Sequence, residues 1–85
     1  MKTKEQKLPK WFDGELYARG ETVTNPFTNE SFELNAIELT MYDFIIGANM
    51  LAERGMISSK NQAYMQKGLI WFRRNNPEAY MALLD

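Results

Sequence analysis

Carboxylates are the side chains of this chain best suited to catalytic chemistry, because its 85 residues include neither histidine nor cysteine. That composition removes the commonest general base, the thiolate nucleophile and the commonest transition-metal ligand. Seven carboxylates stand close together in the sequence: Asp13, Glu15, Glu21, Glu30, Glu33, Glu38 and Asp43. Such groups can act in pairs as acid and base or bind a divalent cation, but no calcium-loop spacing is present. We therefore expect no catalytic residue, no cofactor and no metal site.

Glu38 has a structural explanation in its local sequence. Asn35 is a preferred N-cap residue, and Glu38 follows three positions later, where its side chain can reach back to the amide of the cap. Leu34 and Leu39 flank this pair as a hydrophobic staple. The pattern predicts that a helix begins at residue 36 and that Glu38 serves its first turn.

The predicted first helix covers residues 36–54 and is followed by Gly55, which suits a left-handed C-cap. Of the 17 residues from Ala36 to Ala52, 12 are apolar. At about 100° per residue they cover two faces of the helix instead of one. The second of these faces is our candidate protein interface, and it consists of Leu39, Tyr42, Ile46 and Met50.

This second face has two interpretations. If a hairpin covers one side of the helix and another helix covers the other, the face belongs to the core. If the hairpin packs at an edge, the face stays exposed, and a self-complementary apolar patch is a common basis for a twofold dimer. The helix also carries Glu38 and Asp43, so we do not read it as a membrane span.

A second helix is predicted over residues 59–75. It begins near Ser58 or Ser59, and Ser59-Lys60-Asn61-Gln62 fits the capping-box pattern. Met65, Gly68, Leu69 and Phe72 form its apolar face. Its candidate basic and aromatic face consists of Lys60, Tyr64, Lys67, Trp71, Arg73 and Arg74. That face can follow a phosphate backbone with aromatic stacking, or it can be an ordinary solvated face with edge aromatics in the core.

Residues 15–34 are predicted to form a β-hairpin region, with strands at 22–25 and 31–34. Pro26 and Asn29 suit the turn between them. Asn25-Pro26-Phe27 also matches a peptide signal read by some eukaryotic adaptor domains, but we favour turn chemistry. Residues 14–19 are open to two interpretations, a third strand or a short helical turn.

After the second helix, Asn76 and Pro77 predict the cap and first position of a short helix over 77–84.

The predicted fold class is α+β, in which an antiparallel hairpin of two or three short strands precedes two long helices and a short C-terminal helix. We expect one domain over residues 1–85, with residues 1–10 as a flexible basic arm that holds four lysines and one glutamate. Adjacent exposed aromatics are costly, so Trp11 and Phe12 are expected to clamp this arm onto the core. The N-terminal residues do not resemble a secretion signal, and we expect a cytoplasmic protein.

Several runs of the chain carry a resemblance. They are Val23-Thr24-Asn25-Pro26-Phe27-Thr28, the stretch 32–45, Trp71-Phe72-Arg73 and Asn76-Pro77-Glu78-Ala79-Tyr80-Met81. From Trp11 onward the chain resembles small uncharacterised proteins of tailed phages (myoviruses) that infect marine cyanobacteria and related marine bacteria. The resemblance implies a phage product made in the cytoplasm of a bacterial host, and it brings no known activity or ligand.

From these observations we expect a non-enzymatic interaction protein that binds another protein, or a second copy of itself, through the first helix. Its partner would be an unidentified host or phage protein. The alternative is a nucleic-acid-binding accessory protein that uses the basic face of the second helix. The net charge of −1 and the lack of an RNA-binding signature make this the less favoured hypothesis.

Overall fold

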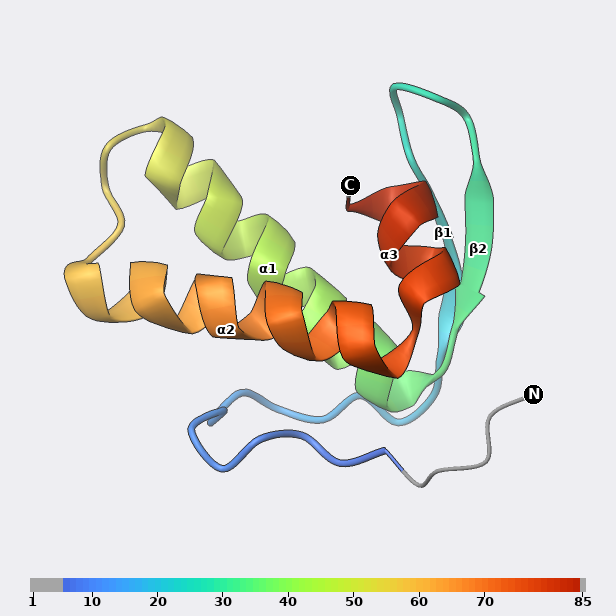
Figure 1. Cartoon of the computed structure of the whole chain (residues 1–85), viewed down its shortest axis with the longest axis horizontal. Coiled ribbons are helices and arrows are strands. Elements are labelled where there is room, and N and C mark those ends of the chain that lie inside the picture. The colour runs from blue at the N-terminus through green and yellow to red at the C-terminus, as the bar shows by residue number, and fades with distance from the viewer. Residues whose placement is uncertain (1–5, 85) are drawn as a thin grey trace.

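The computed structural model describes residues 6–84 and has five regular elements, shown in Figure 1. They are β1 (Glu21–Thr24), β2 (Ser31–Leu34), α1 (Ala36–Glu53), α2 (Ser59–Asn75) and α3 (Pro77–Leu83). This arrangement confirms the α+β fold class, with two strands, two long helices and a short third helix. The helix boundaries agree with the predicted ones to within one residue.

The hairpin pairs β1 and β2 in antiparallel register, with Val23 opposite Phe32 and Thr24 opposite Ser31. Its turn begins at Asn25, whose Oδ1 accepts a hydrogen bond of 2.8 Å from the backbone N–H of Phe27. Asn29 has a φ of 67°, a left-handed conformation that asparagine tolerates better than most residues. The predicted turn chemistry is therefore confirmed.

Residues 14–19 form neither a strand nor a helical turn. The backbone N–H of Tyr17 donates instead to the hydroxyl of Thr40 on α1, at 3.0 Å. Gly20 then passes so close to β2 that an added Cβ would lie 1.8 Å from the carbonyl oxygen of Leu34. The chain is thus held against the start of α1 before it enters β1.

Both ends of α1 have the predicted boundary chemistry. Asn35 Oδ1 accepts from the Glu38 N–H at 2.8 Å, and Glu38 Oε1 accepts from the Asn35 N–H at 3.1 Å, which completes the capping box. At the other end, Gly55 has a φ of +68° and the Met56 N–H donates to the carbonyl of Leu51 at 2.8 Å. This is the Schellman arrangement that a C-terminal glycine favours.

At the start of α2 the structure selects Ser58 over Ser59 and lacks the expected capping box. The N-cap of α2 is Ser58, whose hydroxyl accepts from the Asn61 N–H at 3.1 Å, so Ser59 and Gln62 do not form the expected box. The cap of α3 is as predicted, with Pro77 at the first position and Asn76 Oδ1 accepting from the Ala79 N–H at 3.2 Å.

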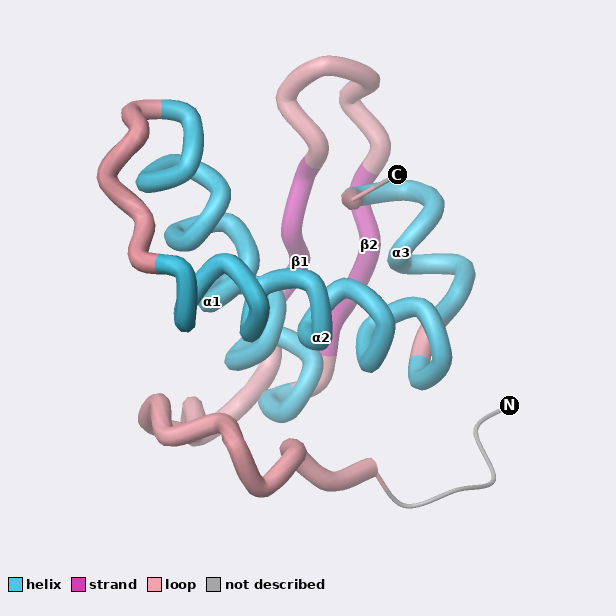
Figure 2. The backbone as a smooth tube through the Cα atoms, turned by 60° about the vertical axis from the view of Figure 1, so that its left-hand side comes forward, coloured by secondary structure: helices cyan, strands magenta, loops and turns pink. Residues whose placement is uncertain are grey.

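The core lies where α1, α2 and α3 meet the inner face of the hairpin. Its buried apolar residues are Leu34, Leu39, Met41, Ile45, Ala48, Met65, Phe72, Ala79 and Leu83. α3 packs on β2, and α1 lies on the side of β1, as Figure 2 shows. The connection between α1 and α2 is at the opposite end of the molecule from the hairpin (Figure 1). Within residues 6–84, no helix has the length and apolar character needed to cross a bilayer.

Candidate functional site

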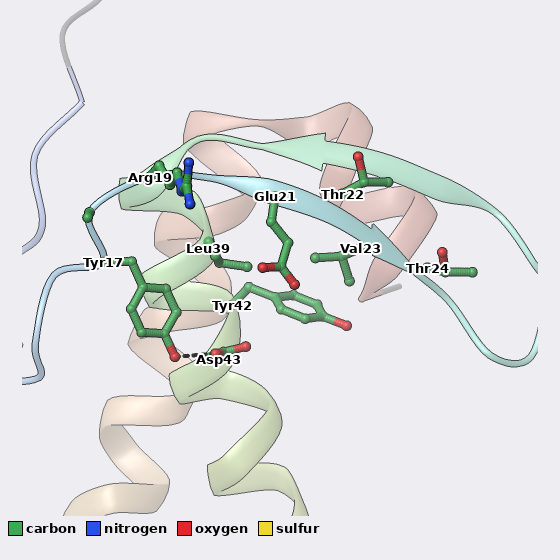
Figure 3. Close-up of a pocket in the computed structure, with 10 residues that line it drawn as sticks. Tyr17, Arg19, Glu21, Thr22, Val23, Thr24, Leu39, Tyr42 and Asp43 are labelled. Carbon is green, nitrogen blue, oxygen red and sulfur yellow. Dashed lines mark hydrogen bonds between the residues drawn. The ribbon is translucent and has the colours of Figure 1, made fainter.

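A groove of about 590 Å³ lies between β1 and α1 (Figure 3). β1 forms one wall, while Leu39, Tyr42 and Asp43 of α1 line the other side. Residues 17–19, just before β1, complete the lining. Because β1 and α1 are fixed by the hairpin register and the capping box, these side chains share one surface although they are distant in sequence. We call this surface the β1–α1 groove.

The β1–α1 groove is acidic and aromatic. The hydroxyl of Tyr17 donates a hydrogen bond to Asp43 Oδ2. This bond, followed by the negative charge of Asp43, partial desolvation and the charge of Glu21, raises the pKa of Tyr17. Burial and then the charge of Asp43 raise the pKa of Tyr42. Both phenols therefore stay protonated at neutral pH and face two carboxylates.

The structure divides the predicted interface on α1 into a covered and an open part. Leu39 is buried, with 6% of its surface exposed, and it lines the β1–α1 groove together with Tyr42. Ile46 is half-buried and lies outside the groove, while Met50 is 51% exposed. The four residues thus run from the groove towards the exposed end of the helix.

The C-terminal end of α1 and the residues after it carry further exposed apolar side chains. Leu51 is 40% exposed, and Met56 is 67% exposed. The backbone hydrogen bond between these two residues fixes their positions at the Schellman turn. The open part of the interface therefore includes the end of the helix as well as its second face.

The predicted aromatic residues of the basic face do not lie open for stacking. Trp11 stacks on Tyr64 with ring centroids 4.9 Å apart and planes 17° apart. The amines of Lys60 and Lys67 lie 5.7 and 5.8 Å from the centroid of the same Tyr64 ring. Trp11 also packs against Phe44 of α1, which agrees with its predicted role as a clamp.

Trp71 is engaged in a similar way. Its indole N–H donates to the backbone carbonyl of Lys7 at 2.9 Å, so it holds the N-terminal segment against α2. Arg73 and Arg74 are exposed nearby. The expected flexible arm is described from Gln6 onward, and residues 6–10 lie against the helices; residues 1–5 lie outside the described part.

A polar cluster, in which Gln6, Glu38 and Asn76 are buried and Asn35 is exposed, is the feature that sequence reasoning missed. Glu38 is completely buried, and its Oε2 accepts from the side-chain amides of Gln6 at 2.8 Å and Asn76 at 3.1 Å. The amide of Asn35 also donates to Gln6 Oε1 at 2.9 Å. The capping box located Glu38 correctly, but no local pattern indicates its two distant donors. Complete burial keeps this carboxylate away from any substrate.

Within residues 6–84, no three acidic side chains gather closely enough to hold a metal ion. Comparison with protein-family models, with curated proteins and with solved structures finds no match for the chain. The β1–α1 groove and the α1 surface beside it form the candidate functional site.

Proposed function

We propose that this chain is a non-enzymatic interaction protein that binds another protein through the β1–α1 groove and the exposed apolar surface of α1. The observation that carries the proposal is the groove itself, an open surface with two tyrosines and two carboxylates beside an apolar helix face. Tyrosine is enriched at protein interfaces because its ring buries apolar area while its hydroxyl forms hydrogen bonds.

The surface around the groove supports the same proposal. Ile46 and Met50 continue the apolar face along α1, and Leu16 is 57% exposed just before Tyr17. Exposed apolar residues that adjoin a groove add contact area to an interface, whereas isolated ones need no explanation. The partner is proposed to cover both the groove and this face.

The proposed setting is the cytoplasm of a bacterium infected by a tailed phage, and it rests on the resemblance of residues 23–28, 32–45, 71–73 and 76–81 to small phage proteins. The partner is then a host or phage protein, or a second copy of the chain. No enzymatic step is included in the proposal, because the sequence offers no histidine or cysteine and the completely buried carboxylate of Glu38 has a structural role.

Ile46→Glu tests the proposal in affinity capture of the tagged chain from infected cells, with light scattering of the purified chain beside it. Ile70→Glu is the matched control, because Ile70 is 49% exposed on α2. We expect captured or self-associated species to be lost with Ile46→Glu and kept with Ile70→Glu. A monomeric wild type whose captured proteins are the same for both variants would overturn the proposal.

Nucleic-acid binding is the competing proposal, supported by the exposure of Lys60, Lys67, Arg73 and Arg74 along α2. It predicts salt-dependent binding of single or double strands that is abolished by Lys67→Glu together with Arg74→Glu, because each lost phosphate contact lowers affinity and salt dependence. The engagement of Tyr64 and Trp71 by the N-terminal segment counts against base stacking. A wild type that shifts no nucleic acid at low salt removes this alternative.

A further inference from the structure

The outer edge of β1 has backbone groups that the hairpin does not use. In an antiparallel pair, residues that exchange hydrogen bonds alternate with residues that point their backbone groups outward. The N–H of Asn25 donates to the carbonyl of Glu30 at 2.8 Å, so the hydrogen-bonded positions of β1 are Asn25, Val23 and Glu21. Thr22 and Thr24 therefore point their N–H and C=O groups away from β2.

Side-chain spacing supports this assignment. Opposed side chains lie closer in non-hydrogen-bonded pairs, and the hydroxyls of Thr24 and Ser31 are 2.8 Å apart. Within residues 6–84, no hydrogen bond from another segment reaches the outward groups of Thr22 and Thr24. This edge borders the β1–α1 groove directly, since both threonines line it.

We propose that an extended segment of a partner protein adds to the outer edge of β1 as a further strand and places a lysine or arginine side chain in the β1–α1 groove. This inference rests on the proposed interaction function and deepens it by assigning the binding mode and the chemistry of the partner. Main-chain hydrogen bonds supply affinity in such complexes, and side chains at alternate positions supply specificity.

The geometry of the edge favours an extended segment. A two-stranded hairpin is marginal alone, and β1 carries neither lysine nor proline, the residues that commonly protect a free edge. An added strand would satisfy the backbone of Thr22 and Thr24. Its alternate side chains would then point to the same side as Val23, which lines the groove towards α1 (Figure 3).

The charge of the groove favours a basic side chain at that position. Glu21 extends towards Tyr42 from β1, and Asp43 lies beside Tyr42 on α1 (Figure 3). Arg19 is the single basic residue of the lining and lies near the start of β1. A lysine or arginine between Glu21 and Asp43 would meet two carboxylates and the face of an aromatic ring, which attracts cations.

The first test uses the synthetic peptide acetyl-VTKTV-amide as a probe and follows backbone amide resonances of the isotope-labelled chain. We expect the largest shifts, and slowed hydrogen exchange, at Thr22 and Thr24. Replacing Glu21 and Asp43 together by Gln and Asn should weaken binding at least tenfold, as should a norleucine in place of the peptide lysine. Replacing Glu30 and Glu33 by Gln is the matched control and should leave affinity unchanged. Equal affinity for both double variants would overturn the inference.

The second test targets the backbone edge. Thr22→Pro removes one outward N–H without removing a β1–β2 hydrogen bond, and edge strands tolerate proline. We expect it to abolish peptide binding, whereas Thr22→Val, which keeps the N–H, should bind like the wild type; thermal melting reports whether each variant is folded. A folded Thr22→Pro that binds normally would overturn strand addition.

Affinity capture separates failure of this inference from failure of the proposed function. Captured proteins that are lost with Ile46→Glu but kept with folded Thr22→Pro support the interaction function and overturn strand addition. Captured proteins that are insensitive to both changes overturn both. The Thr22 and Thr24 amides could instead be protected from hydrogen exchange in the chain without peptide. Together with a dimeric mass, that result would assign this edge to a second copy and overturn the proposal of a partner segment with a basic side chain.

Discussion

The two ends of α1 are held in different ways. At its N-terminal end, Glu38 is completely buried and joins the capping box to Gln6 and Asn76, which come from opposite ends of the chain. At its C-terminal end, backbone hydrogen bonds around Gly55 terminate the helix, and the side chain of Met50 is about half exposed. One end is thus fixed by distant side chains, and the other by local geometry alone.

This difference indicates where a binding surface can be rigid. The β1–α1 groove lies at the fixed end of the helix, where Tyr17 is tied to Thr40 and Asp43. A preformed groove loses less conformational entropy on binding than a flexible one, so more of the contact energy appears as affinity. The C-terminal end of α1 supplies exposed apolar surface, but the distant side chains that hold the N-terminal end do not hold it.

Removing the carboxylate at each end gives the largest contrast. Glu38→Ala should lower the free energy of unfolding by about 3 kcal/mol or more, because each buried donor left without an acceptor costs roughly 1–3 kcal/mol. Glu53→Ala, in the exposed last turn, should change it by less than about 0.5 kcal/mol. Urea unfolding of both variants measures the difference, and similar values would show that the two ends are held alike.

Gly20→Ala sharpens the comparison at the fixed end. The new Cβ would overlap the backbone of Leu34 and Asn35, which cannot move without disturbing the cap of α1. We expect a loss of about 1–3 kcal/mol in thermal or urea unfolding, the usual cost of overpacking. Gly14→Ala is the control, because its Cβ would meet only the ring of Phe12, and a loss as large there would refute the backbone explanation.

Two helical glycines, Gly47 and Gly68, compare an open position on α1 with a packed position on α2. A Cβ on Gly47 of α1 meets nothing within 4 Å, so Gly47→Ala should stabilise the chain by about 0.5–1 kcal/mol through helix propensity. A Cβ on Gly68 of α2 would lie 3.1 Å from Met41 Sδ and 3.3 Å from Ile45 Cγ1. We expect Gly68→Ala to be less stable than Gly47→Ala by about 1 kcal/mol, and equal melting temperatures would contradict this.

The smallest predicted effect is a change in tyrosine titration at the groove. The pKa of Tyr17 lies above its ordinary value of 10.0, so the unfolded chain releases this proton first as the pH rises. The corresponding stability is fully present below pH 10.0 and is lost as the pH rises through the folded pKa. Ultraviolet titration should show that Asp43→Asn lowers the pKa of Tyr17, with Tyr17→Phe to assign the signal. An unchanged titration curve would exclude the Tyr17–Asp43 bond in solution.

The elements of the fold could be predicted because their signals are local. Asn35 with Glu38, Gly55, and Asn76 with Pro77 each act within a few residues of the boundary that they mark. The same reasoning failed at residues 14–19, because Tyr17 bonds to Thr40, 23 positions away. It also failed to separate Ser58 from Ser59 as a cap, since both residues offer the same hydroxyl.

The candidate site could be predicted only in part, for the same physical reason. The helical period placed Leu39 and Tyr42 on one face of α1, and the structure does bring both to the groove. The pattern could not show that β1 faces them, because strand placement depends on contacts across the whole chain. Tyr64 and Trp71 were recognised as prominent, but their partners Trp11 and Lys7 lie more than fifty residues earlier.

The hydrogen bond between Asn76 and Glu38 has a consequence for the chain as it is synthesised. The capping box can close as soon as the first turn of α1 leaves the ribosome, because Asn35 and Glu38 are neighbours. Asn76 is made 38 residues later, and until then the cluster lacks one of its donors. A nascent chain that stalls before Asn76 therefore has the start of α1 without this second amide donor to the Glu38 carboxylate.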